Sequence, residues 1–405
     1  MGKNTDLAAA KAAKNDEFYT QWRDIEAEML AYTDFNPDVF RDKTLLLPCD
    51  DPAASNFTKF FALNFESLGL KKLISTSYAP ASNPAVEEYG QLTLGFELGE
   101  DTDPKFTEQD TWERGRIYVL ERGHDTNGDG RLNKDDLQWD YLDGDGDFRS
   151  EEITALRDEA DMVITNPPFS LFREFIAWIM AGNVQFSIIG NKNAITYKEV
   201  FPLFRDNQIW LGNGFTNGNA YFQIPEHLAR DYASGVLDPS TCTVHFRNTD
   251  WFTNIPHGKR YEPLDLMTMA DNKLYGPKKI VEDGYPRYDN YDAIEVPATK
   301  GIPSDYDGVM GVPISFLDKY NPEQFAILGI TKTWDTHSDL KTKVYPTQTQ
   351  VSASGKKSRV GKLNDGAAIP HSAPPKGVTY YEVDGQFFTQ AYARILIHHR
   401  NPKED

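Results

Sequence analysis

The sequence predicts an α/β protein with a doubly wound, mostly parallel β-sheet and an antiparallel edge. Short apolar segments alternate with amphipathic ones from residue 44 to about 211, which is the spacing of strands and crossover helices. One apolar segment, 162–165, ends in two prolines and an aromatic residue, and another, 44–47, ends in an acidic turn. Because open α/β sheets bind ligands where parallel strands end, both turns are expected at the functional edge of the sheet.

The elements of the first half follow from local periodicity. Short apolar runs are typical of buried parallel strands, and longer runs with apolar residues on one face are typical of helices. The predicted strands are residues 44–48, 71–77 and 162–165, and the predicted helices are residues 53–68 and 151–157. We interpret the connection at about 80–140 as an insertion, with hairpin strands at 91–98 and 116–120.

The alternation of helices and strands continues after residue 169. Ser170 is predicted to be the N-cap of the next helix. The predicted helices are residues 171–179 and 198–205, and the predicted strands are residues 185–190, 208–211, 219–224 and 241–247, the last two as a terminal hairpin of the sheet. From about residue 271 Tyr, Pro, Asp and Gly become frequent, so we predict an irregular region that ends in a strand at about 387–397.

Composition restricts the class of protein. The chain has 405 residues, enough for one large or two moderate domains, and 40% of them are hydrophobic. Its two cysteines, Cys49 and Cys242, lie far apart in the sequence, which predicts no disulfide framework and a reducing, cytoplasmic location. Uninterrupted apolar runs stay well short of the ~20 residues of a membrane helix, and the polar N-terminus predicts no signal peptide, so we expect no membrane partner.

The charge is distributed unevenly along the chain. A net charge of −19 argues at first against nucleic acid, because contact with phosphates requires basic surface. Residues 97–161, however, contain 21 Asp and Glu against 8 Lys and Arg, a net charge of −13. Residues 341–405 contain 10 Lys and Arg against 5 Asp and Glu, a net charge of +5. The basic, loop-rich C-terminal part is consistent with a DNA contact, and a flexible surface loop is the alternative.

Asn166, Pro167, Pro168 and Phe169 carry the clearest chemical pattern. Prolines fix φ and bias the preceding residue toward extended backbone, so this turn is stiff. An exocyclic amine is a weak nucleophile, and the Asn166 side-chain oxygen and the Pro167 carbonyl can accept its two N–H groups while Phe169 stacks on the ring. Transfer of a methyl group to that nitrogen then depends on positioning and needs no general base. The alternative is an ordinary exit from a strand.

Two further segments have the chemistry of a cofactor site. Cys49, Asp50 and Asp51 follow the first strand in a turn that lacks glycine, so a cradle for a pyrophosphate is not predicted. Carboxylates at this place suit the amino-acid end and the ribose of S-adenosylmethionine, and a solvated acidic turn is the alternative. Asp147 and Phe148 lie one strand before the proline turn, and they can hold an adenine through the carboxylate and the ring.

Residues 125–136 match the pattern of a calcium-binding loop. The predicted ligands are Asp125, Asn127, Asp129, the Arg131 carbonyl, Asn133 and Asp136. We expect a structural Ca²⁺ ion on an insertion, and the alternative is a surface turn rich in Asp, Asn and Gly.

Several long stretches carry a resemblance to a known family. They are CDDP at 49–52, GDGDFRS at 144–150, TNPPFSLFRE at 165–174, TYKEVF at 196–201, YDNYDAI at 288–294 and GVMGVPI at 308–314. With them the chain resembles the EcoRI-type adenine-specific DNA methyltransferase family over nearly its whole length. The glycine-poor turn at 49–52 and the calcium-like loop at 125–136 depart from the pattern of most methyltransferases.

The resemblance implies a Rossmann-like class I fold, in the gamma-like motif order, and methyl transfer from S-adenosylmethionine to N6 of an adenine flipped out of double-stranded DNA. The residues that it implies for cofactor binding are Tyr19, Thr20, Cys49, Asp50, Asp51, Asp147, Phe148 and Asn166. The residues that it implies for catalysis are Asn166, Pro167, Pro168 and Phe169. Tyr197 is a second aromatic candidate for the flipped base, and a tyrosine of the core or the surface is the alternative.

Domains and partners follow from the same resemblance. We expect a flexible tail at 1–15, a catalytic domain at 16–265 and a target-recognition region at 266–405, whose final strand at 387–397 can return to the core. Double-stranded DNA is the expected partner, which places the enzyme in the cytoplasm, at the nucleoid of a bacterial or phage-infected cell. A cognate restriction endonuclease belongs to the expected system without a stable complex, and an orphan or phage modification enzyme is the other form.

Two other functions fit parts of the pattern. Turns like Asn166–Phe169 also serve methyltransferases that act on RNA or on protein amides. A calcium-dependent binding module on a vestigial methyltransferase fold is an alternative of a different class, and failure to bind S-adenosylmethionine would favour it.

Overall fold

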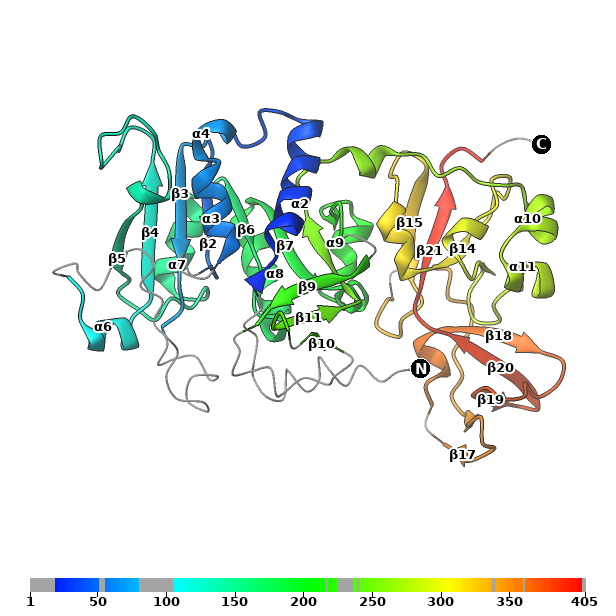
Figure 1. Cartoon of the computed structure of the whole chain (residues 1–405). Helices are drawn as coiled ribbons and strands as arrows, with labels where there is room; N and C mark the ends of the chain where they lie inside the picture. The colour runs from blue at the N-terminus through cyan, green and yellow to red at the C-terminus, as the bar shows by residue number, and fades with distance from the viewer. Residues whose placement is uncertain are drawn as a thin grey trace. The chain divides into compact units, whose positions relative to one another are not determined.

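The computed structural model describes residues 19–50, 55–79, 105–215, 218–224, 236–238, 240–336, 339–359 and 361–402. The described residues up to Lys192, together with Ile209–Gly258, form one compact unit. Asn193–Gln208 and the described residues from Lys259 onward form a second unit. Figure 1 shows the course of the chain through both units. The predicted tail at 1–15 and the predicted strand at 91–98 lie outside the described residues.

The first unit contains an eight-stranded mixed sheet in the order β5-β4-β3-β2-β6-β7-β12-β8. Its four central strands are parallel to one another, and they are β3 (Lys72–Thr76), β2 (Thr44–Leu47), β6 (Met162–Thr165) and β7 (Gln185–Asn191). The outer strands pair antiparallel, and they are β4 (Arg116–Glu121), β5 (Gln138–Tyr141), β12 (Thr249–Thr253) and β8 (Trp210–Leu211). The α/β prediction is confirmed, but the sheet is more mixed than the mostly parallel sheet that was predicted.

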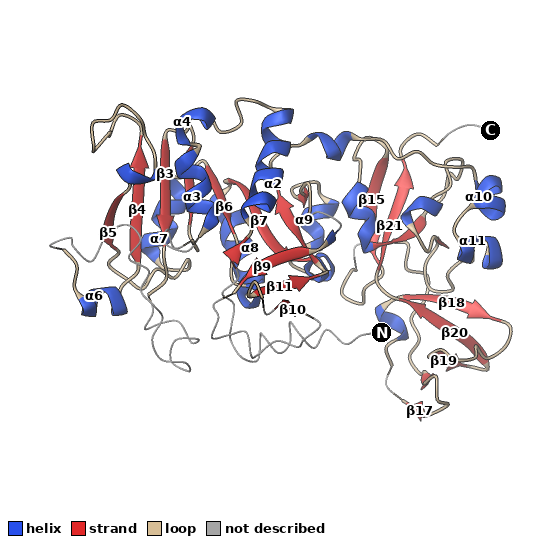
Figure 2. Ribbon diagram, in the orientation of Figure 1, coloured by secondary structure: helices blue, strands red, loops and turns tan. Residues whose placement is uncertain are grey.

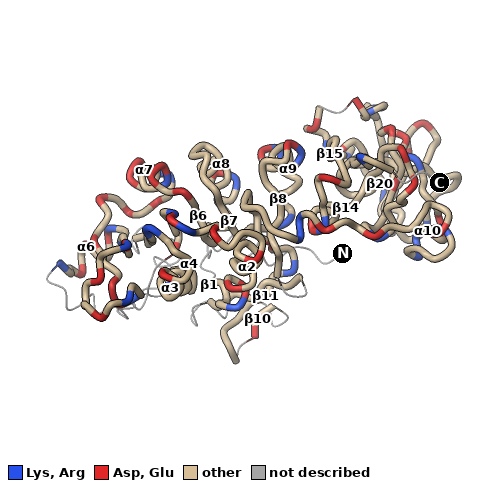
Figure 3. The backbone as a smooth tube through the Cα atoms, turned by 90° about the horizontal axis from the view of Figure 1, so that it is seen from above, with Lys and Arg blue, Asp and Glu red and all other residues tan. Residues whose placement is uncertain are grey.

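Helices cover both faces of this sheet. One side carries α2 (Trp22–Phe35), α3 (Asn56–Leu63) and α4 (Phe65–Leu68), and the other carries α7 (Glu151–Glu159) and α8 (Phe172–Gly182), as Figure 3 shows. The four residues of β2 and of β6 are all buried, because helices cover the strands on both sides. Phenylalanines of α3 and α4 (Phe57, Phe61 and Phe65) fill the core on the first side. The unit also contains α6 (Glu108–Glu113).

A smaller four-stranded sheet completes the first unit. It has the order β1-β9-β11-β10, with β1 (Tyr19–Thr20), β9 (Ala220–Gln223), β11 (Thr243–Phe246) and β10 (Leu237–Asp238). The predicted hairpin at 219–224 and 241–247 is therefore confirmed as an antiparallel pair. Its predicted place at the edge of the main sheet is wrong, because β9 pairs with β1 and the main sheet takes β12 instead.

The start of α8 differs from the prediction. A 3-10 turn, Phe169–Leu171, follows the prolines, and α8 begins only at Phe172. The N-cap position of α8 is Leu171, whose side chain cannot accept a hydrogen bond, so the prediction of Ser170 as the N-cap is wrong. Pro168 occupies the N-cap position of the 3-10 turn, and Ser170 is an exposed residue within that turn. The helix predicted at 198–205 is shorter, α9 (Phe201–Arg205), and a 3-10 turn at Lys192–Thr196 comes before it.

The second unit contains two sheets and short helices (Figure 2). One sheet has β13 (Ile294–Glu295), β14 (Met310–Pro313), β21 (Arg394–His399) and β15 (Phe325–Ile330). The other has β17 (Lys357–Ser358), β16 (Thr349–Val351), β19 (Tyr380–Val383), β20 (Gln386–Ala391) and β18 (Ala367–His371). Besides α9, the α-helices in the described part of this unit are α10 (Met269–Tyr275) and α11 (Lys278–Asp283).

The prediction of an irregular region from residue 271 is therefore wrong. The strand predicted at 387–397 is also two strands, β20 and β21, which pair within the two sheets of the second unit. A partly buried ion pair between Arg394 of β21 and Glu295 of β13, with a nitrogen–oxygen distance of 2.8 Å, lies within the first of these sheets. Among the helices of the described residues, none combines the length and the apolar character that crossing a membrane requires.

Candidate active site

The Asn-Pro-Pro-Phe turn lies at the end of a central parallel strand, as predicted. Thr165, the last residue of β6, is fully buried, and Asn166 is half-buried with its side-chain oxygen shielded from solvent. Phe169 is half-buried and points its ring edge-to-face at Phe222 and Phe246 of the small sheet, with centroid distances of 6.1 and 6.4 Å. The ring therefore retains accessible surface, while the aromatic contacts fix its position.

Asp50 is buried at the end of β2, with 4% of its surface exposed. Its two carboxyl oxygens accept different hydroxyl groups: Oδ1 from Ser55 at 2.7 Å and Oδ2 from Thr165 at 2.5 Å. Its backbone N–H donates to the Thr76 carbonyl of β3 at 3.1 Å. Asp50 therefore connects the ends of three neighbouring strands. Asp51, the other predicted carboxylate of this turn, lies outside the described residues.

The Cys49 thiol stays protonated beside this carboxyl group. Burial raises its pKa well above the usual value, and the nearby Asp50 raises it further. A thiol is a far weaker nucleophile than a thiolate, so Cys49 is unsuited to covalent catalysis here.

Tyr19 and Thr20 lie next to both turns. Thr20 pairs with Phe222 in the small sheet, and its carbonyl accepts a hydrogen bond from the Asn56 side chain at 2.8 Å. Asn56 is the first residue of α3, directly after the turn at the end of β2. The Thr20 hydroxyl is buried and has no hydrogen-bond partner among the described residues, which is the state expected of a group that bonds to a ligand.

The segment that carries Asp147 packs against the end of β3. The Ala79 N–H donates to the Asp145 carbonyl at 2.7 Å, and Gly146 lies so close to Ser77 that a Cβ atom would be 2.3 Å from the Ser77 carbonyl oxygen. The ends of β2, β3 and β6 and this loop therefore form one polar edge of the first unit. Ser77 and Asn56 belong to this edge and were not predicted as site residues, because only the folded chain places them beside the predicted ones.

Asp147 and Phe148 differ in their exposure. The Asp147 carboxylate is paired with Arg149, whose hydrogen bonds lower the pKa of Asp147 and keep it charged. Phe148 is only 4% exposed and packs against Phe175 and Trp178, at centroid distances of 4.9 and 5.7 Å. This packing leaves little of the ring for an adenine, so Phe148 is better placed to hold Asp147 in position than to stack on a ligand.

Tyr197 lies in the second unit, directly after the 3-10 turn at Lys192–Thr196, and 37% of its surface is exposed. Its backbone N–H donates to the Ala194 carbonyl at 2.9 Å. Contact between Tyr197 and a flipped base stays a prediction.

In the calcium-like loop, carboxylates accept hydrogen bonds from backbone N–H groups of the same loop. Asp125 accepts from Gly128 and Gly130, and Asp129 accepts from Arg131. Burial opposes ionisation of Asp136, but hydrogen bonds from Asn133, Thr126 and Asn127 outweigh it and lower its pKa. The described residues contain no group of three or more His, Cys, Asp or Glu that could hold a metal ion. The geometry therefore favours a loop stabilised by hydrogen bonds.

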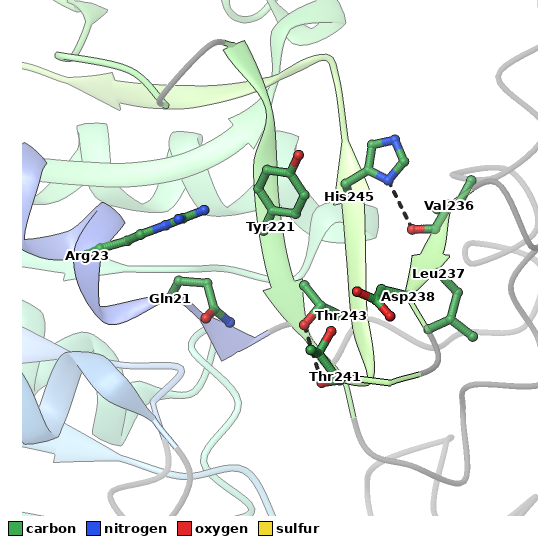
Figure 4. Close-up of a pocket in the computed structure, with 9 residues that line it drawn as sticks. All are labelled: Gln21, Arg23, Tyr221, Val236, Leu237, Asp238, Thr241, Thr243 and His245. Atoms are coloured by element: carbon green, nitrogen blue, oxygen red, sulfur yellow. Dashed lines mark hydrogen bonds between the residues drawn. The ribbon is translucent and has the colours of Figure 1, made fainter.

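A cavity of about 370 Å³ opens on the outer face of the small sheet. Figure 4 shows Tyr221 and His245 on neighbouring strands of this face, with Arg23 and Gln21 beside them. The Arg23 guanidinium lies 5.7 Å from the Tyr221 ring centre. Because side chains alternate along a strand, these residues face away from Phe222 and Phe246, and the cavity is separate from the Phe169 side of the sheet.

A mixed α/β sheet with Asn-Pro-Pro-Phe at the end of a central parallel strand, beside a turn at 49–52 whose sequence lacks glycine, is the arrangement of a methyltransferase that acts on an exocyclic amine. Comparison with known proteins identifies the family. The model of the family described as "Adenine-specific methyltransferase EcoRI" matches residues 6–400. The chain belongs to this family and is an adenine-specific methyltransferase, which confirms the resemblance.

Curated relatives agree with this assignment. The chain is 41% identical over 340 residues to Type II methyltransferase M.EcoRI of Escherichia coli, covering 82% of this chain and 91% of that protein. It is 33% identical over 348 residues to Type II methyltransferase M.MpnI of Mycoplasma pneumoniae, covering 83% and 89%. Type II methyltransferase M.MgeORF184P of Mycoplasma genitalium is also 33% identical over 348 residues, covering 83% and 90%. No solved structure matches the chain.

Proposed function

We propose that this enzyme transfers a methyl group from S-adenosylmethionine to N6 of an adenine that has rotated out of double-stranded DNA. The observation that carries the proposal is the turn Asn166–Phe169 at the end of β6, with Asp50 and Thr20 at the same edge. The first unit then corresponds to a Rossmann-like class I methyltransferase domain with an insertion after β3. The second unit contains most of the region assigned to target recognition.

In this proposal the turn Asn166–Phe169 promotes methyl transfer by orienting the adenine amine. The Asn166 side-chain oxygen and the Pro167 carbonyl accept the two N6–H groups of the adenine, which aims the nitrogen lone pair at the methyl donor. Phe169 stacks on the base and compensates for the stacking that the base loses when it leaves the duplex. No residue needs to remove a proton before transfer, since alignment and electrostatics lower the barrier.

The polar edge suits the cofactor. When bound, S-adenosylmethionine supplies the methyl group as a sulfonium. The buried Thr20 hydroxyl, which has no partner among the described residues, is a ready hydrogen-bond group, and the edge offers carboxylates where a phosphate-free ligand can use them. The residues proposed to hold it are Tyr19, Thr20, Cys49, Asp50, Asp51, Asp147 and Asn166, with Phe148 supporting Asp147.

Asn166→Ala tests the proposal. The variant removes one of the two acceptors for the amine, so we expect adenine methylation to fall at least ~100-fold while the affinity for S-adenosylmethionine stays within a few-fold. Methylation is measured by sequencing treated DNA for modified adenines, and affinity by calorimetry. Ser67→Ala, on the exposed surface of α4, is the matched control. Full turnover by Asn166→Ala would refute the assigned role.

The substrate class is tested directly by competition. Duplex DNA, RNA and protein are supplied together with the methyl donor, and we expect the label in the DNA. Label in RNA or in a protein amide would favour the alternative substrates. A wild-type protein that does not bind the methyl donor would favour a binding module.

Calcium binding by residues 125–136 and pairing with a cognate restriction endonuclease stay predictions. Calorimetry with Ca²⁺ tests the first. Asp125 also accepts the Gly128 and Gly130 N–H groups, so Asp125→Ala removes a predicted ligand and these two hydrogen bonds together, and it should abolish any heat that the wild type gives.

A further inference from the structure

We infer that Asp50 positions the amine-binding turn as well as the cofactor turn, because each of its two carboxyl oxygens serves one of them. This inference rests on the proposed function. It assigns Asp50 a role through Thr165 and Ser55, in addition to whatever contact it makes with the cofactor.

The two hydroxyl groups that bond to Asp50 come from different parts of the site. Ser55 donates to Oδ1 at 2.7 Å, and its own oxygen accepts from the Phe57 N–H as the N-cap of α3. Thr165 donates to Oδ2 at 2.5 Å, and the next residue along the chain is Asn166. One carboxyl group therefore orients the helix that begins after the cofactor turn and the strand end that carries the catalytic amide.

The sheet itself leaves the end of β6 incompletely fixed. β6 pairs with β7 up to Thr165 and Ile188, but its described ladder with β2 stops at Leu46 and Val163. The Asp50–Thr165 hydrogen bond therefore takes over where the backbone pairing with β2 ends. It restrains the strand on the side of the cofactor turn, immediately before Asn166.

The backbone of Asp50 is fixed on the opposite side, by β3. Its N–H donates to the Thr76 carbonyl, and the Ser75 hydroxyl donates to its carbonyl oxygen. Because these two hydrogen bonds to β3 hold the backbone of Asp50, its side chain is a rigid support for Thr165. A buried carboxyl group that is held on both sides transmits position well, since moving it would break several hydrogen bonds at once.

Substitution of the two donors tests the roles of the two Asp50 carboxyl oxygens separately. Thr165→Val removes the donor to Oδ2 at nearly constant volume, so we expect kcat to fall about tenfold with the Kd for S-adenosylmethionine within about twofold of wild type. Thr165→Ser keeps the hydroxyl and should restore most of kcat. Ser55→Ala removes the donor to Oδ1, and we expect the opposite division, with the larger effect on the Kd for S-adenosylmethionine.

Asp50→Asn tests the same link from the other partner. An amide keeps one acceptor oxygen and loses the other, so combining it with Thr165→Val should lower kcat by less than the product of the single effects. Thermal denaturation shows which variants fold, and Thr165→Ser keeps the test readable if Thr165→Val does not fold. The inference is overturned if Thr165→Val keeps the wild-type kcat, if Thr165→Ser is no better than Thr165→Val, or if Thr165→Val weakens cofactor binding as much as turnover. A wild-type enzyme without adenine methylation would instead refute the proposed function.

Discussion

Some buried polar side chains of the first unit join distant parts of the chain through hydrogen bonds to backbone groups. Outside the site, Glu28 of α2 is the clearest example. Glu28 is fully buried, accepts from the Tyr32 hydroxyl at 2.6 Å, and accepts from the Asn213 and Gly214 N–H groups. Burial raises the pKa of Glu28 from 4.5 to about 7, although these hydrogen bonds partly oppose the shift. Glu28 thus connects α2, the helix that follows Thr20, to the loop before β9.

Glu28 makes stability depend on pH with a definite sign. The folded state keeps the proton up to about pH 7, whereas the unfolded state releases it near pH 4.5, so this stabilisation is fully present below pH 4.5 and is lost as pH rises through 7. Its total is about 3 kcal/mol. We expect Glu28→Gln to flatten the decrease in Tm between pH 5 and pH 8, measured by thermal denaturation. An unchanged slope would contradict the raised pKa.

At the scale of elements, the site depends on how the loop of Asp147 packs against the end of β3. Gly146 has a φ of +84°, and a Cβ atom there would be 2.3 Å from the Ser77 carbonyl oxygen, which is backbone and cannot move aside cheaply. Gly146→Ala is therefore expected to displace the loop and to raise the KM for S-adenosylmethionine roughly tenfold or more, with a lower Tm.

Gly144→Ala is the control for this prediction. Two residues earlier in the same loop, a Cβ atom would meet only the Glu152 side chain, at 3.8 Å. Initial rates at varied cofactor concentration should therefore be close to those of the wild type. Equal KM values for the two variants would show that the close approach to Ser77 has no functional weight.

Elements fixed by local pattern were predictable, and those fixed by distant pairing were not. β2, β6 and β7 lie within one residue of their predicted bounds, because a buried parallel strand is itself an apolar run. The sheet that contains the predicted hairpin depends on β1, which lies about 200 residues earlier in the chain than its partner β9, and periodicity carries no information about such pairs.

The candidate site shows the same division. Asn166 and Asp50 were predictable from their place after apolar strands. The hydrogen bond from Thr165 to Asp50 and the packing of Phe148 against Trp178 depend on neighbours that only the fold brings together. The sheets of the second unit were missed partly because strands such as β13 and β17 have only two residues, which is too few to show an alternation.

At the scale of the whole molecule, a protein with a net charge of −19 is expected to bind DNA, which is itself a polyanion, so its basic residues have to be concentrated on one surface. The acidic residues concentrate in 97–161, and Figure 3 shows Asp and Glu along α7 within this range. The second unit exposes Lys356, Lys357, Arg359 and Lys362 on and beside β17. Lys357 is paired with Glu382 at 2.7 Å, so its charge is partly compensated. We therefore expect DNA to contact this surface of the second unit.

Lys356 gives the sharpest test of this surface. It lies in the turn between β16 and β17, whose backbone is closed by a hydrogen bond from the Ser352 N–H to the Lys356 carbonyl, so a side-chain change should leave the turn intact. Each phosphate contact releases counterions, and Lys356→Gln should therefore weaken DNA binding equally for all sequences and lower the slope of log K against log salt by about 1.

Lys71→Gln provides the comparison, because Lys71 is also exposed but lies just before β3, at the opposite end of the strands from Asn166. Fluorescence anisotropy with labelled duplex at several salt concentrations gives both slopes. A slope that falls for Lys71→Gln and stays constant for Lys356→Gln would place the DNA on the first unit instead. A loss of affinity confined to the DNA sequence that the enzyme recognises would assign Lys356 to base recognition, since a phosphate contact carries no sequence information.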